Sequence, residues 1–599
     1  MANPLPTAER EPFRVEEPAI AHAGKGLRSR LFGIDFALLP VLALPLLLLK
    51  LDDTWLFAYS ASEQGFIDTW LYFGYFLDFT HHLRTFRSGY VAGRLPWVLP
   101  GVFAYHFFSP IVAACVLHVV FFWIALVSLY LVLKHTVGRR AALLSAFLMG
   151  CYSYFLWAIG WDYVDGATIS YMLLTLCLLT YAAKAVRPQR WLVLSGAAFA
   201  LAIYTHLFVI SFVPAFALYY FFARREHGMD WPASSRRLLL RGFLAVTVLF
   251  AVLNVVLRAA PLFFLVPALS RASRFVGTGN RWFDSSYGWL ASAFWLLLPG
   301  VAALGAFLSV NLSEKPRTWR GFRFFWQLHL AVCAFIMLMW QLSGQPVLQL
   351  PFVYTSLLIP AVFLALGAQM AAALERLSPR QFAALWIVAA GILVLPFVVP
   401  LHSQIVTAVE QHRWLSPAGL GIAAVVLLAR QFRYTGALAV LLLCASVATL
   451  TATTGTRTWG HPGAPDDPRL QKQAFLAIVD SVRAVQQIDP TDHLFFWYDF
   501  RAPLGPLHRS VSSTFMWWHR LVSETFPSLD VLTGPPYPTY KPLQPHLKIA
   551  ILTVDEDALQ RADDTLRKVG LTARFISQRR ISEGPISWSM IVIETEKAE

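Results

Sequence analysis

The chain has 599 residues, of which 57% are hydrophobic and only 14% are charged. This composition excludes a soluble enzyme with a single anchor and is typical of a protein that crosses a membrane many times. The formal net charge is +14, yet the basic residues lie mostly in short loops between apolar runs, where they orient membrane proteins. No basic face accompanies a nucleic-acid-binding motif, so we expect no nucleic-acid partner.

The chain begins with a Pro-rich, basic segment, residues 1–33. We expect it to be a cytoplasmic tail, because no cleavage site follows the first apolar run. Apolar runs of nearly the ~20 residues that a helix needs to cross a bilayer then recur along the chain. They lie at about 34–51, 110–133, 141–159, 167–185, 191–204, 207–223, 238–258, 289–309, 324–342, 352–374, 382–400, 416–430 and 434–452. The sequence therefore predicts an α-helical polytopic membrane bundle of about thirteen spans over residues 34–454.

The charges of the loops test whether successive spans cross the membrane in alternating directions. Those rich in Lys and Arg all fall on one side, as cytoplasmic loops should; they lie at 134–140, 187–190, 224–241, 315–323, 375–380 and 430–433. An odd number of spans then places the C-terminal part on the other side. We expect a multi-pass protein of a bacterial inner (plasma) membrane, with a cytoplasmic N-terminus and a periplasmic or extracytoplasmic C-terminal domain.

The composition changes near residue 455 to that of a small α/β domain, residues 455–599. The strand-like and helix-like segments alternate in an order that suits a compact sheet with helices on one face. The expected helices lie at 470–485 and 556–570, and the expected strands at 494–500, 548–554, 572–580 and 588–595.

The first outer loop, residues 52–109, is too long for a simple connector, and its apolar, aromatic content argues against disorder. It carries Asp52, Asp53, Asp68 and Arg94. Carboxylates and guanidiniums at a membrane surface are costly unless they are paired, hydrated or used. We interpret the loop as the front wall of an active site at the lipid–water boundary, with Asp68 on a short interfacial helix.

Other charged and aromatic residues on the same side are further candidates, and each also has a simpler reading. Asp162 and Asp165 lie in a brief turn between two spans and could be ordinary turn residues. The loop arginines Arg271, Arg274 and Arg281 suit a phosphate, although an exposed basic loop would look the same.

The remaining candidates have equally simple alternatives. Trp497 and Asp499 end a predicted strand and could meet an acceptor, or Trp497 could belong to the sheet core. Asp52 and Asp53 could mark the end of the first helix, and Arg94 could contact a lipid headgroup.

The first loop carries two motifs that resemble those of the GT-C glycosyltransferases, which are integral-membrane enzymes that take sugars from polyprenyl-phosphate donors. Asp68-Thr69-Trp70 resembles the D-P-W-like motif of oligosaccharyltransferase catalytic subunits, with Thr in place of Pro. Asp52-Asp53 resembles the D-E pair of protein mannosyltransferases and lipid A aminoarabinose transferases. Only one of the two can be the counterpart of the essential acid, and the aromatic context favours Asp68.

Three further motifs resemble the family's. Gly93-Arg94-Leu95-Pro96 is similar to the Lys-Pro-Pro-Leu type motif whose lysine meets the donor phosphate, with Arg for Lys. Residues 162–166 form a D-x-x-D-G relative of the metal-binding D-x-E-G motif, with one extra residue. Residues 496–500, FWYDF, resemble the W-W-D-Y-G acceptor motif but lack its glycine, so recognition of a peptide sequon does not carry over.

The resemblance implies transfer of a hexose or pentose, with inversion, from a polyprenyl-phosphate-linked donor to an envelope glycan, lipid or protein. Asp68, or its rivals Asp53 and Asp52, would be the base. Arg94, with Arg271, Arg274 and Arg281, would bind the donor phosphate, and Trp497 with Asp499 would bind the acceptor. Asp162 and Asp165 would hold a divalent metal, Mg or Mn, if one is used.

Two other classes stay open at this point. A secondary transporter or lipid flippase should show two related halves and ionisable residues near mid-membrane, whereas the spans here are nearly free of charge. An envelope polysaccharide polymerase or ligase would use the same kind of donor but would rely on large-loop arginines and histidines.

Overall fold

The computed structural model of the chain describes thirteen ranges or single positions. These are residues 35–51, 67–77, 79, 91–160, 163–258, 269, 321–344, 347–348, 354–398, 435–454, 468–488, 495–498 and 544–598. The predicted cytoplasmic tail and the apolar runs expected at 289–309 and 416–430 lie outside these residues.

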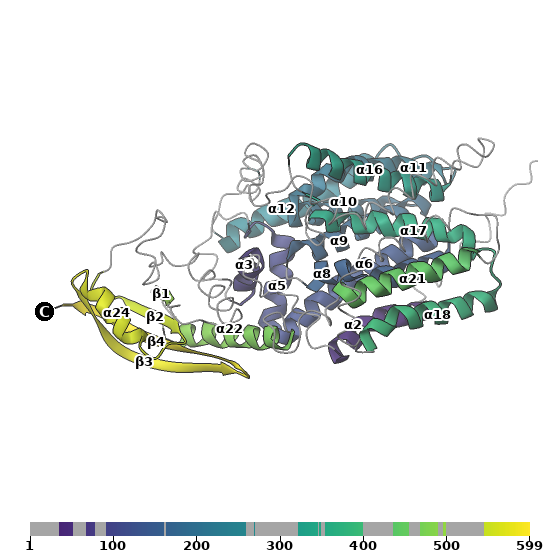
Figure 1. Cartoon of the computed structure of the whole chain (residues 1–599). Coiled ribbons are helices and arrows are strands. Elements are labelled where there is room, and N and C mark those ends of the chain that lie inside the picture. The colour runs from purple at the N-terminus through teal and green to yellow at the C-terminus, as the bar shows by residue number, and fades with distance from the viewer. Residues whose placement is uncertain are drawn as a thin grey trace, which may run out of the picture. The chain divides into compact units, whose positions relative to one another are not determined.

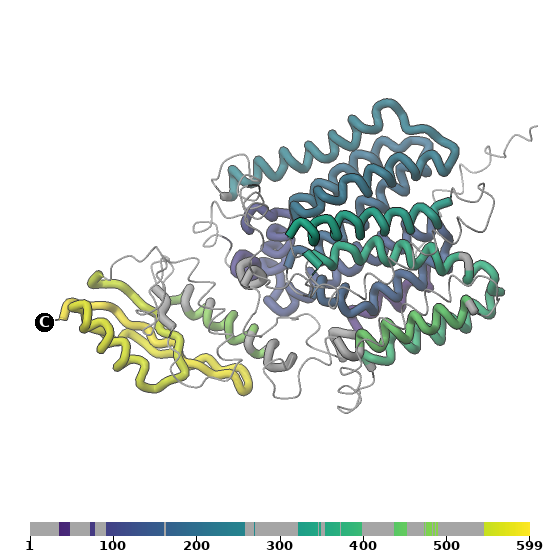
Figure 2. Tube along the Cα trace, turned by 45° about the horizontal axis from the view of Figure 1, so that its top comes forward, coloured from purple at the N-terminus to yellow at the C-terminus, as the bar shows by residue number. Residues whose placement is uncertain are grey.

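The first part of the chain is helical throughout the described ranges, and its long helices run side by side (Figures 1 and 2). Its first half contains η1 (Phe36–Leu38), α2 (Leu39–Leu51), α3 (Ile67–Leu77), α5 (Leu95–Phe107), α6 (Pro110–Thr136), α7 (Arg139–Gly150), α8 (Ser153–Gly160), α9 (Val164–Lys184) and α10 (Gln189–Thr205). Its second half contains η2 (Leu207–Phe212), α11 (Val213–Arg225), α12 (Ser235–Arg258), α16 (Phe322–Leu342), η3 (Tyr354–Leu358), α17 (Ile359–Leu374), α18 (Pro379–Val398) and α21 (Thr435–Thr454).

The described helices confirm a polytopic helical membrane bundle. Seven are long and apolar enough to cross a bilayer, or eight if one bent pair forms a single span. Two shorter apolar helices, Phe36–Leu47 and Gly436–Thr451, coincide with further predicted runs. The short helix predicted around Asp68 is present as α3. The count of thirteen spans stays a prediction, because two of the runs lie outside the described residues.

The run at 141–159 differs from a single straight span, because α7 and α8 meet at an angle of 62°. The helix ends at Gly150, and the ring of Tyr152 packs into the bundle against Phe363. The break removes the Cys151 carbonyl from the helical hydrogen-bond ladder, and Thr451 of α21 donates its hydroxyl to that carbonyl (Oγ1–O 2.6 Å). The bend is tolerated inside an apolar bundle because its freed backbone group is satisfied.

Two glycines allow a close helix crossing between α10 and α12. A Cβ atom at Gly196 would lie 2.0 Å from the Leu239 carbonyl oxygen, and one at Gly242 would lie 1.8 Å from that of Val193. Membrane helices commonly use small residues in this way, because the backbones can then approach and gain packing contacts.

We expect Gly196→Ala to destabilise the bundle, because the added methyl group meets backbone that cannot rotate away. Overpacking of this kind costs about 1–3 kcal/mol. The matched control is Gly391→Ala in α18, where an added Cβ meets nothing within 4 Å. Thermal unfolding in detergent, followed by tryptophan fluorescence, should show a lower midpoint for Gly196→Ala only; equal midpoints would contradict the close crossing.

The C-terminal part contains a four-stranded sheet of order β1-β2-β4-β3. Its elements are α22 (Pro468–Ile488), β1 (Phe495–Tyr498), β2 (Lys548–Thr553), α24 (Ala558–Arg567), β3 (Leu571–Glu583) and β4 (Ile586–Lys597). β1 is parallel to β2, whereas β2 and β3 are both antiparallel to β4. Each helix and strand expected in this region overlaps one of these observed elements.

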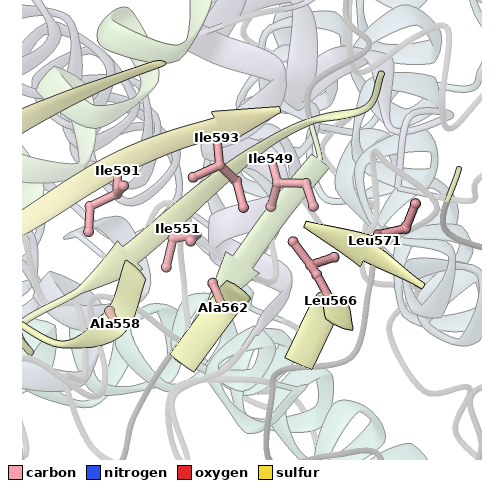
Figure 3. Close-up of a cluster of buried hydrophobic side chains, with 8 residues drawn as sticks. All are labelled: Ile549, Ile551, Ala558, Ala562, Leu566, Leu571, Ile591 and Ile593. Carbon is pink, nitrogen blue, oxygen red and sulfur yellow. The ribbon is translucent and has the colours of Figure 1, made fainter. Parts of the chain in front are cut away.

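The sheet has a helix on each face, which corrects the prediction that both helices share one face. Helix α24 covers the face of Ile549, Ile551, Ile591 and Ile593, and together they form a buried apolar cluster (Figure 3). Trp588 lies on the opposite face, because strand side chains alternate, and its indole N–H donates to Ser481 of α22 (3.1 Å). The strands thus bury residues on both faces, and Val592 and Met590 are accordingly inaccessible.

Asp563 joins α24 to β3. Its carboxylate accepts the backbone N–H of Ala573 (2.7 Å) and the Arg567 guanidinium (2.7 Å). Burial acts to raise the pKa of Asp563, but these two hydrogen bonds outweigh burial and hold the pKa below its usual value. The ionised carboxylate is therefore the form that stabilises this connection.

A carboxylate with a lowered folded-state pKa stabilises above its unfolded pKa, about 3.9 for Asp, and that stability is lost as the pH falls through the folded-state value. We therefore expect hydrogen-exchange protection of the α24–β3 connection, corrected for intrinsic rates, to fall below about pH 4. Asp563→Asn should reduce this protection at neutral pH and remove its pH dependence. The exposed neighbour Asp564, changed to Asn, should behave as wild type; a wild-type profile for Asp563→Asn would refute the assignment.

Candidate functional site

Two of the predicted site residues, Arg94 and Asp165, are described with their side chains. Asp68 is the second residue of α3 and Trp497 the third residue of β1, and in both cases only the backbone is described. The other candidates lie outside the described residues; they are Asp52, Asp53, Asp162, Arg271, Arg274, Arg281 and Asp499.

Arg94 lies at the start of α5, where it is the N-cap residue. Its carbonyl accepts the N–H groups of Trp97 (3.0 Å) and Val98 (3.0 Å), which begins the helix. Pro96 is well suited to the first turn, because the N–H that it lacks would have no helical partner there. The motif GRLPW therefore places a guanidinium at the positive end of a helix dipole, an arrangement that favours an anion.

Two tyrosines hold the Arg94 side chain. Its Nη1 donates to the hydroxyl of Tyr72 (2.6 Å) and of Tyr163 (3.3 Å). The guanidinium carbon also lies 5.9 Å and 5.6 Å from the two ring centroids, within cation–π range. Tyr72 comes from α3 and Tyr163 is the N-cap residue of α9, so the arginine ties together segments that are distant in sequence.

The packing of α3 on α5 brings Tyr72 to Arg94. Phe76 lies one turn after Tyr72, and its ring occupies the space that a side chain at Gly101 would need, with 2.0 Å from the would-be Cβ. The same ring meets the indole of Trp97 edge-on, at 5.5 Å between centroids. A glycine on α5 and two aromatic residues one turn apart on α3 therefore determine this local geometry.

Asp165 lies in the first turn of α9 and is only 1% exposed. The hydroxyl of Ser356, in η3, donates to its Oδ1 atom (3.4 Å). Arg94 is close enough to interact electrostatically with the carboxylate. A negative charge also suits this place because it faces the positive end of the α9 dipole.

His206 interrupts the chain between α10 and η2, at the point where two apolar runs were predicted to divide. Its Nδ1 atom accepts the N–H of Phe208 (3.2 Å), so Nδ1 is unprotonated and caps η2. The imidazole meets the ring of Tyr354 in η3 edge-on, at 5.2 Å between centroids. Arg94 also interacts electrostatically with this imidazole.

One end of the bundle thus collects a guanidinium, a carboxylate and an imidazole from three separate segments. The guanidinium at a helix N-terminus can bind a phosphate, and the buried carboxylate keeps it from being an isolated charge in an apolar region. Within the described ranges there is no group of three His, Cys, Asp or Glu side chains that could hold a metal ion.

Four residues of this site were not singled out from the sequence: Tyr72, Tyr163, Tyr354 and Ser356. Tyr72 follows Asp68 by one helical turn, and Tyr163 stands between Asp162 and Asp165, so both lay inside segments that were already candidates. Ser356 had no sequence signal, because a serine in an apolar run has many structural roles. The sequence marked His206 only as the point where two apolar runs divide, and the structure shows that it caps η2.

Part of the chain matches a known protein family. Residues 95–257 match the family model described as dolichyl-phosphate-mannose-protein mannosyltransferase. The matched segment runs from α5 to α12 and begins directly after Arg94. For that segment, the match confirms the expected resemblance to GT-C membrane glycosyltransferases. No curated protein is significantly similar in sequence.

Solved structures of two proteins are similar to the chain at low identity. ArnT from Cupriavidus metallidurans bound to undecaprenyl phosphate has 15% identity and a TM-score of 0.44, with 93% of this chain and 97% of that chain covered. The oligosaccharyltransferase of Archaeoglobus fulgidus in its apo form has 14% identity and a TM-score of 0.43, with 80% and 64% covered. These likenesses are too distant to carry an argument about this chain's chemistry.

We expect Ser356→Ala to destabilise the site, because it removes the hydroxyl that donates to buried Asp165; an unsatisfied buried group costs about 1–3 kcal/mol, and more if charged. Thermal unfolding in detergent should show a lower midpoint. In an Asp165→Ala background, the same serine change should have a smaller effect, because the two residues are coupled. Additive effects would show that the hydroxyl and carboxylate act independently.

Proposed function

We propose that the protein transfers a sugar from a polyprenyl-phosphate-linked donor to an acceptor at the outer face of the membrane. The observation that carries this is the position of Arg94: a half-buried guanidinium at the N-terminus of α5, held by Tyr72 and Tyr163. A cation that is fixed before the reaction stabilises a leaving phosphate without the cost of rearranging solvent.

Arg94 acts on the phosphate, and the tyrosines act on Arg94. When the sugar C1–O bond to the donor phosphate breaks, negative charge grows on the departing phosphate oxygens. The guanidinium and the dipole of α5 both favour that charge. Tyr72 and Tyr163 are positioning residues, because their hydroxyls and rings restrict the guanidinium to one orientation.

A first-loop aspartate is the proposed base, which would accept the proton of the attacking hydroxyl. Position 68 lies one turn before Tyr72, so helix register puts both positions on the same side of α3. This favours Asp68 over Asp53 and Asp52, because Tyr72 contacts Arg94 directly. Attack from the side opposite the leaving phosphate, in a single displacement, gives the inversion that the family resemblance implies.

The remaining roles follow the sequence motifs. Arg271, Arg274 and Arg281 are proposed as further phosphate contacts, and Trp497 with Asp499 as acceptor contacts in the C-terminal domain. The acceptor is an envelope glycan, lipid or protein, and the domain is proposed to be periplasmic or extracytoplasmic, with the N-terminus in the cytoplasm.

A divalent metal would be held through Asp165 together with Asp162. Among the described side chains, Asp165 is hydrogen-bonded to Ser356 and neighbours Arg94, so it resembles a partner of the guanidinium more than a metal ligand. No step of the mechanism above requires the metal.

Asp68→Asn tests the base. It keeps size and most hydrogen bonding but removes the proton acceptor, so transfer should fall by about 10²–10⁴-fold while the protein still folds. The measurement is complementation of a deletion strain, in which the envelope glycans and the accumulated lipid-linked sugars are analysed together. The donor lipid should accumulate, and one sugar should be missing from one glycan.

Two further variants make this test decisive. Arg94→Ala should abolish transfer as well and weaken donor binding, whereas Asp68→Asn should leave donor binding intact. Asp53→Asn is the matched control: if it abolishes transfer and Asp68→Asn does not, the base is Asp53. If neither aspartate matters in a well-expressed protein, the proposed mechanism fails.

A further inference from the structure

The end of the bundle opposite Arg94 is also rich in charge. Helix α9 connects the two ends: Asp165 lies in its first turn and Lys184 is its last residue, roughly 28 Å further along the axis. Helices α6 and α11 end beside it, and α16 begins there, with Trp326 donating its indole N–H to Thr136 of α6 (3.1 Å). Three helix C-termini therefore meet at this end.

Ionisable side chains from all three helices converge here. His135 lies near the end of α6, and its ring centroid is 5.0 Å from that of Tyr181 in α9. His135 interacts electrostatically with Lys184, Lys134 and His227. His227 follows α11, and its ring centroid is 5.6 Å from that of Phe322 at the start of α16. We call Lys134, His135, Lys184 and His227 the basic cluster.

Helix dipoles alone do not account for the basic cluster. Cations do stabilise helix C-termini, and Arg224 has this role: its guanidinium donates to the carbonyls of Ala182 (3.1 Å) and Ala185 (3.2 Å) at the end of α9. It also donates to the Asp230 carbonyl (2.7 Å) and stacks on Trp231. Arg224 therefore binds the C-terminus of α9 and the Asp230 carbonyl, and the basic cluster is additional to it.

Among the described residues, the basic cluster is paired with no protein carboxylate. Within the described ranges neither of its lysines forms a salt bridge, and Lys134 lies over the ring of Tyr130 instead. Glu226 is next to His227 in sequence but likewise makes no ion pair there. The Nε2 atom of His227 is enclosed and has no hydrogen-bond partner among the described side chains. Burial, Lys184 and Arg224 all lower the pKa of His227, so its proton is disfavoured by its neighbours.

We propose that the basic cluster is an anion site that binds a phosphate group at the membrane face opposite Arg94. Two lysines from α6 and α9 supply charge, and the two imidazoles supply N–H donors. A phosphate there would relieve the repulsion among the cations and join the ends of α6, α9 and α11. The phosphate could belong to an anionic lipid headgroup or to a soluble ion. This site is independent of the sugar transfer proposed above.

The test measures the thermal midpoint of the full chain in detergent as ligand is added. The probes are dioctanoyl phosphatidylglycerol, dioctanoyl phosphatidylcholine and inorganic phosphate. We expect phosphatidylglycerol to raise the midpoint and phosphatidylcholine not to. Lys184→Gln and Lys134→Gln should each raise about fivefold the phosphatidylglycerol concentration needed for a given midpoint shift, since a lysine near an anionic surface contributes about 1 kcal/mol.

The control is Arg237→Gln at the exposed start of α12, which removes the same charge at the same end. It should respond as wild type. A stronger response to inorganic phosphate than to phosphatidylglycerol, with the same loss in both lysine variants, would support the site and identify a soluble ion as its ligand. Equal responses in Lys184→Gln, Lys134→Gln and Arg237→Gln, or no response to either anion in wild type, would overturn the proposal. This test does not measure sugar transfer, so a failure of the proposed transferase function would leave its result unchanged.

Discussion

The placement of Arg94 at the positive end of α5 is the constraint on which this end of the bundle depends. A guanidinium there is unfavourable alone, because both the helix dipole and the apolar surroundings oppose it. The structure compensates with Tyr72, Tyr163 and the nearby carboxylate of Asp165. These groups come from two segments, α3 and the start of α9, so stabilising one charge also determines where α3 and α9 meet α5. The same preorganisation is what phosphate chemistry requires.

Irregular backbone gathers at this end for a related reason. The chain leaves regular helix at His206 and at η3, and both contribute side chains to the site. Non-helical backbone inside a membrane protein is tolerated where its polar groups find partners. His206 supplies such a partner by accepting the N–H of Phe208. Thr451 supplies another at the α7–α8 bend by donating its hydroxyl to the Cys151 carbonyl. His206 therefore both satisfies the interrupted backbone and contributes its imidazole to the site.

The two ends of α9 have opposite electrostatic character. Its N-terminus carries a buried aspartate next to an arginine, whereas its C-terminus gathers Lys184, Lys134 and two histidines, whose lysines form no salt bridge within the described ranges. The helix dipole favours this polarity at each end. Between the ends, the helix is almost entirely buried and uncharged. A membrane-spanning helix needs such separation, because a charged group in mid-span would be costly.

The sequence by itself determined the membrane class, the elements of the C-terminal domain and the short helix around Asp68. These depend on runs and periods of apolar residues, which are local properties of the chain. It also identified Arg94 and Asp165 as candidates from their motifs. Only the tertiary structure decided that these two lie together with Tyr72, His206 and Ser356, that α7 and α8 bend, and that the sheet is covered on both faces. Periodicity shows which side of a helix is apolar but not which neighbour covers it. That choice depends on close contacts such as Gly101 with Phe76 and Gly196 with Leu239, which form only when the whole bundle packs.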